Sequence, residues 1–346
     1  MGEGLELHQL VTNNDTEEEQ SHLPHTENKY DEWPSYMGVI LAAISSLFFS
    51  MCSVIVKWMV NVDPLELAVC RFVGVLVPAI PIVIYKHERI FPAGKRIMLI
   101  LRSFVGTTGL ILSFYAFRHM PLADASVIVF SVPVFVAIFA YIFLKESCGL
   151  ISFVTIILTL FGVILITKPT FIFHNNVPNL TATDENYGDV WGVLAALGAT
   201  IFGANAYILL RALKSLHFAV IMVNFGGFAL VQTVFISWYL GILCWPKCGL
   251  ERLLMVALAI FSFIGQILLT LALQLENAGP VAIARTSDIV FAFIWQVLIF
   301  KEIPNVFSLI GAFLVTSCVI ITGMRKWVLS LPENTPMKLK FHILTK

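Results

Sequence analysis

The chain has 346 residues, of which 58% are hydrophobic and only 13% are charged, and its formal net charge is zero. Its mean hydropathy is +0.86. A soluble domain of this length needs far more charge on its surface, so the composition excludes a soluble globular protein. The balanced charge, without any basic cluster, gives no indication of nucleic-acid binding.

Ten apolar runs are long enough to cross a hydrocarbon core of about 30 Å, and each is predicted to be a transmembrane helix. A β-barrel would alternate polar and apolar residues, which these runs do not. The fold class expected is an all-α polytopic membrane protein. The predicted spans are 36–58, 64–85, 96–117, 123–144, 150–167, 188–210, 218–240, 252–275, 280–300 and 306–324.

Polar segments separate these spans into regions. Residues 1–35 are acidic and bury too little apolar area to fold, and they lack the basic start and apolar core of a signal peptide. The predicted regions are a disordered acidic cytosolic tail (1–35), a first five-helix repeat (36–168), a lumenal or extracellular linker (169–187), a second five-helix repeat (188–324) and a second cytosolic tail (325–346).

A duplicated unit is indicated by two matching stretches. Tyr115–Glu146 aligns without a gap with Leu271–Glu302, and each stretch ends one helix, turns, spans again and stops at a Lys-Glu pair. These pairs are expected to be stop signals and gate contacts. Recurrence in the same register is typical of a repeat. Because each unit holds five spans, the second unit is predicted to enter the membrane inverted relative to the first.

The loops on the side of the N-terminus hold roughly twice as many Lys and Arg residues as the opposite loops, which predicts cytosolic termini. The sequon at Asn179 then faces the lumen or the exterior and is a predicted glycosylation site, whereas the sequon at Asn14 stays unmodified. Cys244 and Cys248 lie on the same outer side and are either bridged or free. The membrane is predicted to be the plasma membrane or the endoplasmic reticulum.

Three basic residues, Arg71, Arg102 and Arg285, fall inside predicted spans, where a charge must pair, face water or have a function. Arg285 is followed one helical turn later by Asp288, and Gln296 returns to the same face. Two readings stay open. Asp288 forms an ion pair that locks the helix, or it holds Arg285 while the guanidinium receives a carboxylate or phosphate at two points. The aligned positions in the first repeat are valines.

The other two arginines also have two readings each. Arg102 either extends toward the nearby cytosolic surface or meets a ligand, because small residues continue its helix face. Arg71 either pairs with Glu66 or belongs to the substrate site. Pro133 is expected to kink the fourth span, and the freed carbonyl either faces the cavity or serves packing alone.

Small residues spaced four apart occupy equivalent faces of the first span in each half. Such a stripe allows close helix packing, which is one reading, and exposure to a central cavity is the other. Tyr207 continues the second stripe. The aligned residues are Ala42, Ser46 and Ser50 in the first half and Ala196, Thr200 and Ala204 in the second.

Ten spans in two inverted five-helix halves, each with a span that ends in Lys-Glu, resemble the drug/metabolite transporter superfamily with its EamA-type repeats. The strings FYAFRHMPLADASVIVFSVPVF and ARTSDIVFAFIWQ are more specifically similar to the G branch of solute carrier family 35. The resemblance implies a ten-helix carrier with its site between the halves. Members of the superfamily carry nucleotide sugars, amino acids or organic acids, and this branch has been associated with calcium homeostasis.

The resulting prediction is a solute carrier that moves a small organic anion by alternating access. The alternative is a non-transporting membrane regulator of partner proteins, for instance in calcium homeostasis. An enzyme is not expected, since the chain lacks an HExxH motif, paired intramembrane aspartates and His boxes. The expected partners are an anionic small molecule, the lipid bilayer and either a second copy or a regulatory membrane protein; no cofactor, metal or nucleic acid is expected. The predicted site residues are Arg285, Asp288, Arg102, Arg71, Tyr207 and Gln296.

Overall fold

The computed structural model describes residues 36–59, 62–92, 94–119, 122–146, 149–167, 186–241, 249–301 and 306–331. Several predictions fall outside this part of the chain. These are the disordered tail (1–35), the sequons at Asn14 and Asn179, the cysteine pair Cys244 and Cys248, and the side chain of Gln296.

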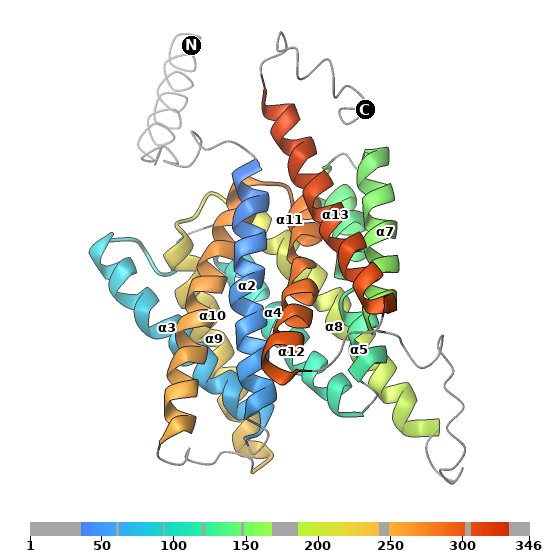
Figure 1. The fold of residues 1–346 in the computed structure, drawn as a ribbon. Coiled ribbons are helices and arrows are strands. Elements are labelled where there is room, and N and C mark those ends of the chain that lie inside the picture. Colours follow the sequence, from blue (N-terminus) through green and yellow to red (C-terminus); the bar gives the residue numbers. More distant parts are fainter. Residues whose placement is uncertain are drawn as a thin grey trace, which may run out of the picture. The chain divides into compact units, whose positions relative to one another are not determined.

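The described residues form helices and short connections (Figure 1). Among the described residues, ten helical stretches are long and apolar enough to cross a membrane, so the predicted class of all-α polytopic membrane protein is confirmed. The elements are α2 (Tyr36–Trp58), α3 (Pro64–Tyr85), α4 (Arg96–His119), α5 (Leu122–Val129), α6 (Val132–Phe139), the π-helical turn η1 (Ala140–Leu144), α7 (Leu150–Thr167), α8 (Asn186–Ala212), α9 (Phe218–Tyr239), α10 (Leu250–Leu275), α11 (Ala278–Arg285), α12 (Ser287–Phe300) and α13 (Val306–Ser330).

The fourth and ninth spans are each broken in the middle, at positions that correspond in the two repeats. Serine hydroxyls at both breaks donate to the carbonyl three residues earlier, Ser131 to Ile128 at 2.6 Å and Ser287 to Ala284 at 2.7 Å. Such bonds compete with the helical ladder. In the first half Pro133, at the start of α6, has no backbone N–H and so removes one more helical hydrogen bond. The kink predicted at this proline is therefore confirmed, whereas the break in the ninth span was not foreseen.

Both Lys-Glu stretches end their helices in the same way. Lys145 follows η1 with φ 54° and ψ 30°, and Lys301 follows α12 with φ 54° and ψ 25°. A residue in the left-handed region is a common way to end a helix, although it is unusual for a lysine. The predicted stop signals are thus helix C-caps.

The last helix runs to Ser330, so the beginning of the predicted second tail is helical rather than tail. Two interactions hold this extension. Val328 is fully buried, and the Lys326 ammonium lies 2.7 Å from a carboxylate oxygen of Glu276. α13 packs against α7, where Gly162 and Gly311 lie so close that a Cβ on Gly311 would be 2.6 Å from the Gly162 carbonyl oxygen.

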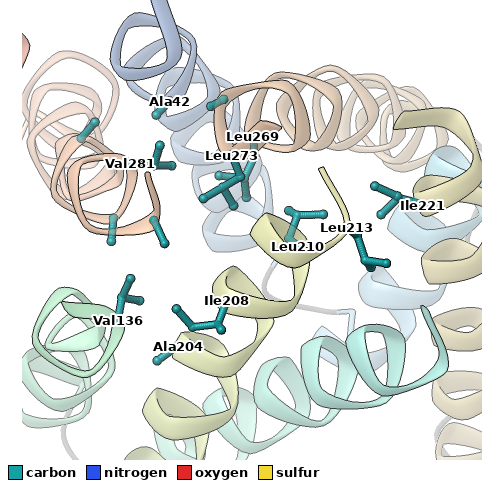
Figure 2. Close-up of a cluster of buried hydrophobic side chains, with 14 of the residues drawn as sticks. Ala42, Val136, Ala204, Ile208, Leu210, Leu213, Ile221, Leu269, Leu273 and Val281 are labelled. Carbon is teal, nitrogen blue, oxygen red and sulfur yellow. The ribbon is translucent and has the colours of Figure 1, made fainter. Parts of the chain in front are cut away.

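Helices of the two predicted halves interlock. In Figure 1 α2 of the first half lies beside α10 and α12 of the second, and α2 also packs against α11. α4 packs against α8 and α9, and α3 packs against α9 and α10. The main buried cluster draws its side chains from both halves, and Figure 2 shows Val136 of α6 near Ala204 and Ile208 of α8. This arrangement brings α2, α8, α11 and α12 together around the candidate site.

Candidate functional site

Arg285, the last residue of α11, is the centre of a polar site between the halves. Its Nη2 lies 3.5 Å from Oδ2 of Asp288, which confirms the predicted ion pair. Its Nη1 donates to Ser46 Oγ on α2 at 3.1 Å, and its Nε donates to Tyr207 OH on α8 at 3.4 Å. The guanidinium also lies over the Phe49 ring, with 4.6 Å from Cζ to the ring centroid. Three helices therefore orient one cation.

A second guanidinium contacts the same ring. Arg71 of α3 places its Cζ 4.9 Å from the centroid of Phe49. The predicted pair with Glu66 is wrong, because no ion pair joins Glu66 and Arg71 within the described residues. Residues five apart on a helix are about 140° apart around its axis, so the two side chains point in different directions. Arg71 instead faces the site, where two cations and the carboxylate of Asp288 gather around Phe49.

Arg102 of α4 is buried rather than extended to a surface, since only 5% of the residue is exposed. Its guanidinium lies over Gly106, where a side chain would collide with Nη1. Its Cζ is 4.4 Å from the centroid of the Phe225 ring. Nε and Nη1 have no hydrogen-bond partner within the described part of the chain.

The two small-residue stripes behave differently. In the first half, Ser46 contacts Arg285 and Ser50 accepts a hydrogen bond from Trp295 Nε1 at 3.0 Å, so this stripe faces the site. In the second half, Thr200 donates to the Ile128 carbonyl at 2.8 Å, so this part of the stripe packs against α5, whereas Tyr207, which continues the stripe, contacts Arg285. A side chain of α8 thus occupies the Ile128 carbonyl near the break, whereas the carbonyl that Pro133 leaves without a helical donor is that of Val129.

Sequence reasoning missed Phe49 and Trp295. Phe49 lies between Ser46 and Ser50 on one face of α2, and that spacing was available as a signal. Trp295 gave no such signal, because an aromatic residue in an apolar span is ordinary. Within the described residues, no three His, Cys, Asp or Glu side chains come together as metal ligands. The site is an aromatic ring with cations around it and polar groups from the opposing helices.

Comparison with known proteins accounts for this architecture. The family model described as the EamA-like transporter family matches the chain twice, over residues 36–168 and 186–324. This chain belongs to the EamA-like transporter family. As a member of that family it is a multi-pass membrane transporter, and the resemblance to family 35 solute carriers is confirmed by human solute carrier family 35 member G1. That protein is 38% identical over 84% of this chain and 80% of its own length.

Less similar proteins align with a similar share of this chain. The pseudopaline exporter CntI of Pseudomonas aeruginosa is 27% identical over 84% of this chain and 97% of its own length. A solved crystal structure superposes with a TM-score of 0.69 at 15% identity, covering 82% of this chain and 94% of that one. At this identity the superposition shows only that the two chains share a fold.

Proposed function

We propose that this chain carries a small organic anion across the membrane by alternating access, with Arg285 as the residue that binds the anionic group. The observation that carries the proposal is the excess of buried positive charge around Phe49. Arg71 and Arg285 both contact that ring, and within the described residues Asp288 forms an ion pair with Arg285 alone. A buried cation without a full counter-charge is costly, and an incoming carboxylate or phosphate offsets that cost.

The geometry of Arg285 favours an anion over a neutral solute. A guanidinium has five N–H donors in a planar fork that matches a carboxylate or a phosphate at two points. Ser46, Tyr207 and Phe49 fix the plane of this fork. Their contacts therefore orient the cation in advance, which lowers the entropic cost of binding.

Arg102 and Trp295 complete the proposed binding region. Arg102 keeps two donor nitrogens, Nε and Nη1, unpartnered in the described residues. Trp295 presents an indole whose N–H is already held by Ser50. We assign to both a role in contacting the part of the solute that Arg285 does not reach.

The orientation is proposed from the sequence alone. The excess of Lys and Arg in the loops on the side of the termini places both termini in the cytosol. Membrane insertion by this rule puts the linker on the outer or lumenal side, where Asn179 is the proposed glycosylation site.

Uptake into proteoliposomes tests the proposal. The purified full chain is given radiolabelled carboxylates and nucleotide sugars, together with neutral and cationic solutes of similar size. We expect uptake of an anion, and a loss of that uptake in Arg285→Gln but not in Arg96→Gln, which removes an exposed guanidinium at the start of α4. Uptake confined to neutral or cationic solutes, or normal anion uptake by Arg285→Gln, contradicts the proposal.

A further inference from the structure

At one end of the helix bundle, a carboxylate of the first half contacts two elements of the second half. Glu146 follows η1 in the first half, and its Oε1 lies 3.4 Å from Nε of Arg211 at the end of α8 in the second half. Its other oxygen, Oε2, accepts a hydrogen bond of 3.2 Å from the backbone N–H of Ala278, the first residue of α11. Glu146 is thus held by two separate elements of the opposite half.

Arg211 is fixed by its own half before it reaches across. Its Nη1 donates to the carbonyl oxygens of Leu273 at 3.0 Å and Gln274 at 2.9 Å, and its Nη2 donates to Oδ1 of Asn277 at 3.1 Å. These bonds occupy the last carbonyls of α10 and the residue before α11. The guanidinium whose Nε faces Glu146 is therefore held rigidly by the second half. When the halves separate, Glu146 is the side chain that must leave this contact.

The second contact of Glu146 is with the N-terminus of α11. A carboxylate is favourable at this end of a helix, where backbone N–H groups are unpaired and the helix dipole is positive. α11 is eight residues long, so about 10.5 Å separates its first residue, Ala278, from its last, Arg285. The same short helix thus carries the contact to Glu146 at one end and the anion-binding arginine at the other.

Buried apolar side chains lie between these contacts and Arg285 along α11. Val136 of the first half belongs to one buried cluster with Ile208 and Val281 of the second half (Figure 2). Ala140 of the first half is part of the same cluster. Val281 is fully buried, and Ala140 is only 3% exposed. Val281 lies between Ala278 and Arg285 on α11, so its side chain is covered by this packing.

A neighbouring ion pair offers a natural comparison. Lys326 of α13 lies 2.7 Å from Oε1 of Glu276, which follows α10, and only 1% of Glu276 is exposed. Both residues belong to the second half. This ion pair therefore stabilises one half internally, whereas Glu146 connects the two.

We propose that Glu146, held between Arg211 and the Ala278 N–H, is an inter-half latch that keeps this end of the carrier closed and must release before the end opens. The inference rests on the proposed alternating-access function and deepens it. Because α11 joins the latch to Arg285, displacement of Arg285 by a bound anion pulls directly on the latch.

Cysteine accessibility measures the latch without a substrate. Val281→Cys is introduced into the full chain, which is placed in nanodiscs and treated with a charged maleimide. Peptide mass spectrometry follows alkylation at residue 281, and the chain without the Val281→Cys replacement gives the background. We expect Glu146→Gln to label about tenfold faster, which corresponds to about 1.4 kcal/mol in the opening equilibrium. Glu146→Asp, which keeps the charge on a shorter side chain, should lie between the two.

Lys326→Gln is the matched control, because it removes an ion pair at the same end within one half. It should lower thermostability without accelerating labelling at residue 281. Equal labelling rates in Glu146→Gln and the parent, with both eluting as folded protein, overturn the latch, and so does equal acceleration by Lys326→Gln. If anion uptake dependent on Arg285 persists in that case, the proposed function stands. If Glu146→Gln labels tenfold faster at residue 281 but the chain takes up no anion, the latch is supported and the proposed substrate class is overturned.

Discussion

The replacement Arg285→Lys separates anion binding from simple helix locking. A lysine keeps the positive charge, so it still meets Asp288 and leaves no buried carboxylate unpaired. It does not reproduce the planar fork, and it cannot contact Ser46 and Tyr207 while presenting two donors to a solute. If Arg285 only locks the helix, this substitution should be nearly silent in transport.

The magnitude follows from the contacts. The lysine variant loses one point of a two-point contact to an anionic group, and a hydrogen bond to a charged group contributes about 1.5–3 kcal/mol. A loss of about 2 kcal/mol corresponds to roughly a 30-fold decrease in kcat/KM for transport. Asp288→Asn should have a smaller effect, because its oxygen lies at 3.5 Å and Arg285 keeps Ser46, Tyr207 and Phe49.

Initial uptake rates in proteoliposomes and thermostability in detergent are measured on both variants from the same preparations. The binding role predicts a large loss of flux for Arg285→Lys at unchanged thermostability. The locking role predicts the reverse: normal flux for Arg285→Lys, and a loss of about 3–5 kcal/mol in stability for Asp288→Asn, which leaves a buried cation unpaired. Normal flux in Arg285→Lys refutes our assignment of this residue.

Three further predictions concern topology, packing and pH. Endoglycosidase should increase the gel mobility of the wild type but not of Asn179→Gln; a glycan elsewhere contradicts the orientation. Gly311→Val should destabilise the protein by about 1–3 kcal/mol through overpacking of α7 against α13, whereas Gly279→Ala, which meets nothing within 4 Å, should not. Burial lowers the pKa of His217, whose neutral Nδ1 caps α9. Its stabilisation is therefore present above about pH 6.5 and lost below it. His217→Asn should flatten the melting temperature between pH 7 and 5; equal pH profiles refute the cap's role.

The sequence determined the class, the number of spans and most of their limits. Lipid requires every backbone polar group to be satisfied within the segment, so a long apolar run leaves few alternatives to a helix. The predicted limits 36–58, 64–85 and 150–167 coincide with α2, α3 and α7. The ion pair between Arg285 and Asp288 was also predictable, since residues three apart on a helix are neighbours.

Partners from distant segments were decided only by the tertiary structure. The prediction for Arg71 considered one helix and chose Glu66, whereas helix packing gave Arg71 the Phe49 ring on α2. Glu146 could be recognised as a span end, but Arg211 and Ala278 reach it only because α8 and α11 of the other half end at the same place. A local pattern fixes which face of a helix a residue occupies. The side chain that faces it depends on how the two halves pack together, and a single apolar sequence does not encode that packing in any short-range pattern.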